Sequence, residues 1–294
     1  MPRQRRIALA TGARYPDLPA DERLVILALA GLGVAAEPVV WDAASAEWPP
    51  FDAVVIRSCW DYHLKLDAFL EWLDRLGRLG VPVFNPTGLI RWNADKRYLL
   101  DLAKRGVTIV PTRLVQQGAP DPHRALLEAL DGLAADEAVV KPAVSASAHG
   151  TWRTSRERAE ADAPAFGALV SAGDVLVQPF VSTVAEAGEW SVICFGGTPS
   201  HTVLKRPAPG DWRVQGELGG TAQRLAMPAA ALRQAEQVLE AAGATRARYA
   251  RVDGCVMDGR FVLMELELIE PQLYLALEAE AAARFARSIV EALD

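Results

Sequence analysis

Residues 251–271 read RVDGCVMDGRFVLMELELIEP and contain the pattern that decides the fold. Apolar and acidic residues alternate through MELELIE, as they do in a strand with one buried face. An Asp-Gly pair at 258–259 indicates a tight turn before this strand. We therefore predict a β-hairpin over 248–269, with Glu265 and Glu267 on one face and the leucines on the other.

Whether Asp253 joins these glutamates depends on the turn. A two-residue turn places Asp253 opposite Met264, on the wrong face, whereas a three-residue loop over 257–259 places it on the glutamate face. We expect the three-residue loop or an equivalent bulge. Three carboxylates on one face can chelate Mg²⁺. A solvated acidic face is the alternative, although strands are poor in glutamate and clustered carboxylates repel one another unless a cation neutralises them.

The composition limits the partners that such a site could serve. The chain has 294 residues, of which 51% are hydrophobic and 23% charged, as in one large or two modest globular domains. Its net charge of −6 argues against nucleic acid as the main partner. Apolar runs are too short for a membrane span or a signal peptide, so we expect a cytoplasmic protein without membrane contact. Cysteine and histidine spacings indicate neither disulfides nor zinc, and P-loop, G-x-G-x-x-G and G-x-S-x-G motifs are absent.

Hydrophobic periodicity divides the chain into three parts. An α/β unit with a parallel sheet is expected first, then a mixed α+β part, then a more antiparallel part. The predicted boundaries are 1–92, 93–181 and 182–294. The predicted strands are 5–10, 36–41, 52–58, 81–85, 138–142, 174–181 and 189–195. The predicted helices are 21–33, 65–80, 93–106, 124–131, 228–243 and 272–292.

Two lysines lie where they could bind phosphate. Lys141 ends an apolar strand, directly before the small-residue stretch AVSASAHGT at 143–151, which we interpret as a mobile loop. Lys96 lies early in the helix predicted over 93–106. A lysine at such a place can hold phosphate as a point charge. For Lys96, a plain surface lysine is the alternative.

The segment around Pro179 suggests a nucleotide base site. Gln178, Phe180 and Val181 leave a strand through a proline-containing turn, where backbone groups could bind an adenine edge. Glu189 opens the next strand, and its carboxylate could accept ribose hydroxyls. An ordinary strand connection with an exposed glutamate is the alternative.

Taken in order, these motifs resemble the ATP-grasp superfamily of carboxylate–amine ligases. The order is Asp-Lys, Val-Lys-Pro, a small-residue loop, Gln-Pro-Phe-Val, Gly-Glu-Trp-Ser-Val, Val-Asp-Gly and Glu-Leu-Glu-x-x-Glu-Pro. The resemblance implies an α/β and α+β chain, with a pre-ATP-grasp domain followed by two subdomains that enclose ATP. It implies phosphate contacts by Lys96 and Lys141 under a loop containing Ser147 and Gly150, adenine contacts by Gln178, Phe180 and Val181, a ribose contact by Glu189, and Mg²⁺ binding by Asp253, Glu265 and Glu267.

One position departs from the family pattern. The family usually has asparagine where this chain has Glu267, so the extra charge should tighten metal binding or require a compensating cation, for which Arg213, Lys205 and Arg206 are candidates. Within the superfamily, the stretches RSCWDY at 57–62 and ELELIEP most resemble the O-ureido-D-serine cyclo-ligases that close the cycloserine ring.

The chemistry implied by this resemblance starts with a substrate carboxylate that attacks ATP to give an acylphosphate, which an amine-type nucleophile then displaces. We assign Lys205 and Arg213 to stabilising the transferred phosphoryl group. Arg57 and Asp61 follow a strand at its carboxyl end and could clamp a small amino-acid-like substrate, or pair with each other. Intermolecular ligation, a nucleotide-binding module without turnover, and formation of a homo-oligomer stay open.

Overall fold

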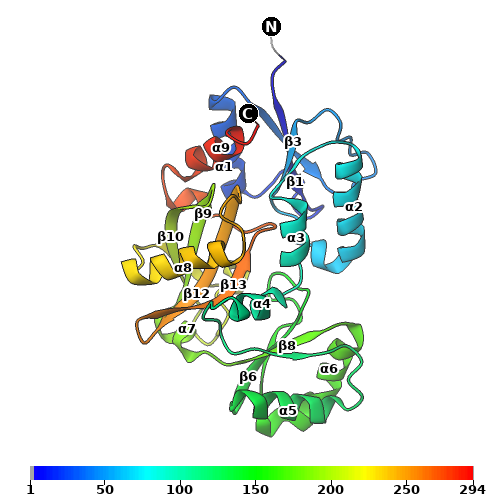
Figure 1. Ribbon diagram of the computed structural model, residues 1–294, viewed down its shortest axis with the longest axis vertical. Helices are drawn as coiled ribbons and strands as arrows, with labels where there is room; N and C mark the ends of the chain where they lie inside the picture. The colour runs from blue at the N-terminus through cyan, green and yellow to red at the C-terminus, as the bar shows by residue number, and fades with distance from the viewer. Residues whose placement is uncertain (1–2, 294) are drawn as a thin grey trace.

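The computed structural model describes residues 3–293, in which the strands form three successive sheets (Figure 1). Sheet A has the order β2-β1-β3-β4, and all of its pairs are parallel. Its elements are β1 (Arg6–Thr11), α1 (Ala20–Gly31), β2 (Ala35–Val40), β3 (Ala53–Ile56), η1 (Tyr62–Lys65), α2 (Leu66–Arg78) and β4 (Val83–Phe84). Ile7 and Leu9 pack toward α1, whereas Ala8 and Ala10 pack toward α2. Residues 7–10 of this strand are all apolar because helices cover both of its faces.

Sheet C follows, with the antiparallel order β5-β8-β6-β7. Its elements are β5 (Arg113–Val115), α5 (Pro122–Leu133), β6 (Glu137–Pro142), β7 (Trp152–Ser155), α6 (Ala159–Ala172) and β8 (Val175–Pro179). The Asp121 carboxylate caps α5 by accepting a hydrogen bond from the Arg124 amide. The helices α5 and α6 pack together against the sheet, and the buried side chains between them form a separate core.

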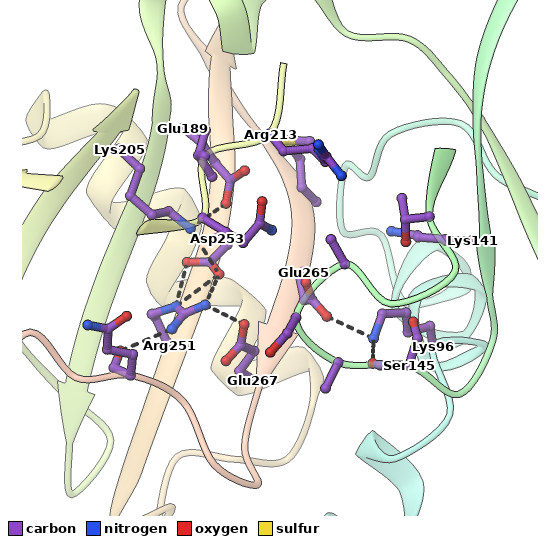
Figure 2. A pocket seen from close by; sticks show the side chains of 18 of the residues that line it. Lys96, Lys141, Ser145, Glu189, Lys205, Arg213, Arg251, Asp253, Glu265 and Glu267 are labelled. Carbon is purple, nitrogen blue, oxygen red and sulfur yellow. Dashed lines mark hydrogen bonds and ion pairs between the residues drawn. The ribbon is translucent and has the colours of Figure 1, made fainter. Parts of the chain in front are cut away.

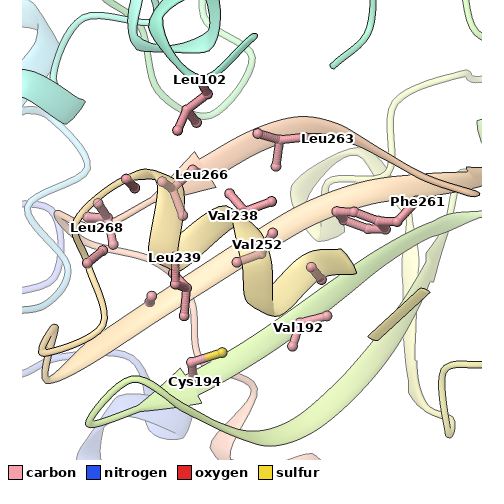
Figure 3. Close-up of a cluster of buried hydrophobic side chains, with 14 of the residues drawn as sticks. Leu102, Val192, Cys194, Val238, Leu239, Val252, Phe261, Leu263, Leu266 and Leu268 are labelled. Carbon is pink, nitrogen blue, oxygen red and sulfur yellow. The ribbon is translucent and has the colours of Figure 1, made fainter. Parts of the chain in front are cut away.

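Sheet B has the antiparallel order β11-β10-β9-β12-β13. Its elements are α7 (Ser182–Ala187), β9 (Glu189–Phe195), β10 (Thr198–Arg206), η3 (Gly216–Leu218), β11 (Thr221–Arg224), α8 (Ala229–Ala241), β12 (Tyr249–Met257) and β13 (Arg260–Glu267). Val192, Val252 and Leu266 point toward α8 and form a core with Val238 and Leu239 (Figure 3). Since side chains alternate along a strand, the polar neighbours of these residues lie on the other face of the sheet.

The C-terminal helix α9 (Ala281–Val290) returns to the first part of the chain. It lies beside α1, and the Phe285 ring stacks on Phe195 with 5.0 Å between centroids. One core therefore contains Ile7 of β1, Phe195 of β9 and Phe285 of α9. Sheets A, C and B lie within 1–92, 93–181 and 182–294, although the two ends of the chain share this core. No helix described over residues 3–293 is both long and apolar enough to cross a bilayer.

Two predicted helices are partly wrong. The helix predicted over 93–106 is shortened to α4 (Tyr98–Lys104). A separate helix, α3 (Thr87–Asn93), ends where the predicted one was to begin, and in the break between them the Lys96 amide donates to the Ala143 carbonyl at 2.7 Å. The helix predicted from residue 272 begins only at Ala281. Residues 275 and 276 instead donate their amides to the Asp21 carboxylate, which holds a short turn, η4 (Leu275–Leu277), against α1. In both cases a contact with a distant segment replaces helical hydrogen bonds.

Candidate active site

A cavity of about 510 Å³ lies where the three sheets meet. Sheet C contributes Lys141, Gln178 and Phe180, whereas loops after β1 and β3 contribute aromatic rings. The polar face of sheet B supplies the charged floor, which Figure 2 shows in close-up. The charged residues that line the cavity are Lys96, Lys141, Glu189, Lys205, Arg213, Glu217, Arg251, Asp253, Glu265, Glu267 and Glu270.

The hairpin places Asp253 on the glutamate face, but not through the expected three-residue loop. The turn has two residues, 258–259, and a bulge between Asp253 and Gly254 shifts the register. Asp253 therefore lies directly opposite Glu265, and Glu267 shares their face, so the expectation of an equivalent bulge is confirmed. Glycine suits the bulge, because a Cβ on Gly254 would lie 2.3 Å from a carbonyl oxygen of the partner strand.

The three acids share a face, yet their carboxylates do not converge. Arg251 Nε lies 3.0 Å from both Asp253 oxygens, and the same guanidinium pairs with Glu267. Glu265 instead turns toward Lys96, 3.0 Å from its Nζ (Figure 2). Within the described residues, no group of three acidic, histidine or cysteine side chains is arranged to hold a metal ion. The donor set nevertheless has the hard oxygen chemistry that suits Mg²⁺.

Arg251 is the compensating cation that the sequence reasoning missed. Lys205 Nζ lies 2.6 Å from Glu189 and 3.4 Å from Asp253, so it also contributes. Arg213 pairs with an aspartate of its own loop, and Arg206 is exposed and does not line the cavity. The signal for Arg251 lay in its position, because a residue two before Asp253 in a strand points to the same face.

These contacts perturb the acids and bases of the floor. Burial raises the pKa of Glu267 to about 7, against the opposing effect of the Arg251 charge. Burial also works to raise the pKa of Asp253, but the charges of Arg251 and Lys205 outweigh it, and the pKa lies below its usual range. In this network Asp253, Glu265 and Glu267 each lie beside a cation that offsets their charge.

Lys141 differs from the other cations that line the cavity. Among the described residues, no side chain or carbonyl forms a hydrogen bond or ion pair with its ammonium group, whereas Lys96, Lys205, Arg213 and Arg251 all have partners. Burial lowers the pKa of Lys141 to about 8, and the charge of Lys96 adds to this effect. An unpartnered, half-buried ammonium group in a cavity fits an anionic ligand such as a phosphate chain.

The loop over 143–151 contains neither strand nor helix, as expected. Its Ser145 carbonyl accepts a hydrogen bond from Lys96 Nζ, which ties the loop to the cavity floor. Ser147 lines the cavity with a φ of 50°. Gly150 does not line it and packs toward Pro142, whose side chain would lie 3.0 Å from a Cβ at that position. The expected role of Gly150 over the phosphates is thus limited to shaping the loop.

The residues expected around the adenine lie together at the sheet C end. Gln178, Phe180 and Val181 all line the cavity. The Arg153 guanidinium lies 3.8 Å from the centre of the Phe180 ring, and Trp212 meets that ring edge to face at 6.2 Å. The Phe180 amide already donates to a backbone carbonyl of β6, so it is not a free donor for a base. The contact offered by Phe180 is therefore its ring.

The expectation that Arg57 and Asp61 clamp the substrate is wrong. Arg57 is fully buried and pairs with Glu22, with N–O distances of 2.6 and 2.8 Å, and neither Arg57 nor Asp61 lines the cavity. They do not pair with each other either, because Asp61 accepts hydrogen bonds from Trp and Lys side chains of its own domain. The same segment does reach the site, through the rings of Trp60 and Tyr62.

Comparisons with known proteins agree with this architecture. The model of the D-cycloserine synthetase DcsG N-terminal domain family matches residues 7–85. The chain is 31% identical to the cycloserine biosynthesis protein DcsG of Streptomyces lavendulae, over 98% of each chain. Its structure is similar to the crystal structure of D-cycloserine synthetase DcsG, with a TM-score of 0.89, 31% identity and coverage of 98% and 100%.

Two more distant structures show the same fold. The RimK domain ATP-grasp protein from Sphaerobacter thermophilus has a TM-score of 0.70 at 19% identity, with 97% of this chain and 99% of that chain covered. The D-alanine–D-alanine ligase from Bacillus anthracis, solved with ATP, has a TM-score of 0.68 at 16% identity, with coverage of 98% and 97%. These likenesses extend over nearly the whole chain and show its fold.

Proposed function

Because this chain belongs to the family of the D-cycloserine synthetase DcsG and is an ATP-grasp ligase that forms carbon–nitrogen bonds, we propose that it closes the ring of D-cycloserine from O-ureido-D-serine. The observation that carries the proposal is the cavity itself. It combines an unpartnered, half-buried lysine with a face of three acids, in a chain that matches the DcsG protein over 98% of both lengths.

The nucleotide would occupy the half of the cavity nearer sheet C. Lys141 is assigned to the phosphates because its ammonium lacks a partner among the described residues. Lys96 is assigned beside it, since the charges of both lysines lower the pKa of Glu265. The base would lie against the Phe180 ring, with Gln178 and Val181 beside it, and the ribose near Glu189.

The metal would be held by the acids of the hairpin. Asp253, Glu265 and Glu267 offer carboxylate oxygens on one face, and their present partners are Arg251 and Lys96. When bound, Mg²⁺ neutralises charge on the phosphates during transfer. Arg251 continues to hold Glu267 and Asp253, and so offsets the negative charge that Glu267 adds relative to the usual asparagine.

The proposed reaction forms an acylphosphate, closes the ring and then removes the carbamoyl group. A carboxylate oxygen of the substrate attacks the γ-phosphorus of ATP, and ADP leaves. The oxygen-linked nitrogen of the ureido group then attacks the acyl carbon, loses its proton, and displaces phosphate as the five-membered ring closes. Hydrolysis removes the carbamoyl group as carbon dioxide and ammonia. Arg213 and Lys205, both in the cavity wall, are assigned to stabilising the negative charge of the phosphoryl group.

Two loops would keep bulk water away from the acylphosphate. The loop over 143–151 lies on one side, tied to Lys96. The irregular segment over 207–220 lies on the other, where Glu217 accepts a hydrogen bond from the Tyr15 hydroxyl at 3.1 Å. Such a shield matters because water would hydrolyse the activated carboxyl group before the weakly nucleophilic ureido nitrogen reacts.

The test is turnover of O-ureido-D-serine with ATP and Mg²⁺. We expect equal amounts of phosphate and ammonia, and a product with the mass of the free ring. The L-enantiomer and a reaction without ATP are the controls. A product with the mass of two joined amino acids would show intermolecular ligation and refute ring closure. Binding of ADP without phosphate release on a broad panel of amino acids would refute ligase activity.

A further inference from the structure

Glu270 lies at the end of the ELELIEP stretch, and the roles assigned above do not use it. It lies three residues after the end of β13, where the chain leaves sheet B and contacts Trp60 from the loop after β3. Its exposure is 7%, and it lines the cavity. Trp60 Nε1 donates to its backbone carbonyl at 2.9 Å, and the Tyr249 hydroxyl donates to the preceding carbonyl, also at 2.9 Å. The backbone at Glu270 is therefore fixed by two side chains.

The Glu270 carboxylate differs from the other acids on the cavity floor. Asp253, Glu265 and Glu267 each pair with an arginine or a lysine, whereas no side chain of the described residues pairs with Glu270. Burial raises the pKa of Glu270 to about 8, and the nearby Glu267 charge adds to the effect. Lys96 lowers that pKa from a distance, but its ammonium is engaged by Glu265 and the Ser145 carbonyl. Near neutral pH this buried carboxyl group is therefore mostly protonated, and a cationic ligand beside it would favour the carboxylate form.

The walls around this carboxylate suit a small organic cation. Tyr15, Trp60 and Tyr62 line the cavity, and the ring centroids of Tyr15 and Trp60 are 5.1 Å apart. They come from the loops after β1 and β3, at the carboxyl ends of parallel strands, where open α/β sheets bind ligands. Aromatic faces attract ammonium groups, and a carboxylate fixes their position. Lys141, the lysine without a partner among the described residues, lies on the sheet C side of the cavity.

We propose that Glu270 binds the ammonium group of the amino-acid substrate and so directs the substrate carboxylate toward the phosphates. The assignment rests on the proposed function and identifies the substrate class as one with a free amino group. With the ammonium at Glu270 and the carboxylate on the side of Lys96 and Lys141, the two charges of the substrate match the charges at the two ends of the cavity. Glu270 thereby determines specificity for amino acids over their deaminated analogues.

The test compares Glu270→Gln with wild type on two ligands, O-ureido-D-serine and 3-(ureidooxy)propionate, which lacks the amino group. We expect the substitution to raise the KM for the amino acid by about 10- to 100-fold, the range for a hydrogen bond to a charged group. The KM for ATP should not change, and the two proteins should bind the deaminated ligand equally in calorimetry. Glu270→Asp should restore part of the discrimination, and Glu186→Gln, at an exposed glutamate of α7, should match wild type.

The outcomes separate this inference from the proposed function. If Glu270→Gln lowers the affinity for both ligands equally, Glu270 has a structural role and the assignment is overturned. If wild type itself binds both ligands equally, the assignment is also overturned, whatever the turnover. If wild type binds the amino acid more tightly than the deaminated ligand but releases no phosphate, the proposed function is refuted and the ammonium site is still supported. If Glu270→Gln does not fold, Glu270→Asp takes its place. The ratio of its affinities for the two ligands, compared with the wild-type ratio, then decides.

Discussion

Lys141→Met should separate stability from nucleotide binding. Burial lowers the pKa of Lys141 from 10.5 to about 8, so charging this side chain in the folded protein costs about 3 kcal/mol. Methionine keeps most of the volume and removes the charge. At pH 7 the free energy of unfolding of the variant should therefore equal or exceed that of wild type, by up to about 3 kcal/mol. Urea unfolding monitored by tryptophan fluorescence measures this difference.

The same substitution should remove most of the affinity for ATP. An ammonium group that meets a phosphate chain in a buried site contributes about 3 kcal/mol, or a factor of about 100 in affinity. Calorimetric titration with ATP and Mg²⁺ measures this loss, and phosphate release should fall with it. Lys104→Met is the matched control, because the Lys104 side chain is 78% exposed and far from the cavity wall.

The pH dependence gives a second measurement on the same lysine. Its pKa is depressed in the folded state, so between about pH 8 and 10.5 the unfolded chain binds more protons and wild-type stability should rise with pH. Over the same window the free enzyme loses the ammonium charge, so affinity for ATP should fall. Lys141→Met should show neither trend. Wild-type affinity for ATP in the variant, or a marked loss of stability, would refute the reasoning.

Three further substitutions test other contacts. Arg57→Met leaves the buried Glu22 carboxylate without its partner and should cost about 3 to 5 kcal/mol of unfolding free energy in urea titrations, whereas an unchanged midpoint would show that the pair is dispensable. Gly197→Ala should lower the melting temperature, because Gly197 has a φ of +80° and a Cβ there would lie 1.8 Å from the Thr245 carbonyl oxygen; calorimetric melting at the wild-type temperature would contradict this. Glu265→Gln should raise the Mg²⁺ concentration needed for half-maximal phosphate release by about 10-fold or more, and an unchanged magnesium profile would remove this residue from the ligand set.

The sequence predicted the hairpin face because alternation along a strand is a local property. Glu265 and Glu267 had to share a face once the strand was identified. The position of Asp253 required one extra residue somewhere in the hairpin, and the structure supplies it as a bulge beside Gly254 rather than in the turn. Periodicity could establish that a shift was needed but not where it occurs, since the bulge depends on a close approach between two strands.

Contacts between distant segments could not be predicted in this way. Arg57 carries no local sign that its partner is Glu22, which lies 35 residues earlier on α1. The break that contains the buried Lys96 likewise depends on the Ala143 carbonyl, which comes from the loop after β6. Arg251 was within reach of strand alternation, but its role required knowing that Glu267 lies opposite to it. Helix and strand types were therefore accessible from local patterns, whereas charge pairing depended on the tertiary fold.

The distribution of the cores determines where the molecule can bend. The core around α5 and α6 draws its side chains from residues 115–177, so the sheet C lobe is held together by its own contacts. The core shared by α1, β9 and α9 instead joins the two ends of the chain into a single body. Two crossings of the chain, near residues 105–112 and 180–188, connect the lobe to this body, and Leu176 of β8 also packs into the core beside α8. We therefore expect any opening that admits nucleotide to bend the chain at these crossings. A pair of fluorescent labels placed on α5 and α8 would report that opening directly, whereas a pair on α1 and α9 would stay at constant separation.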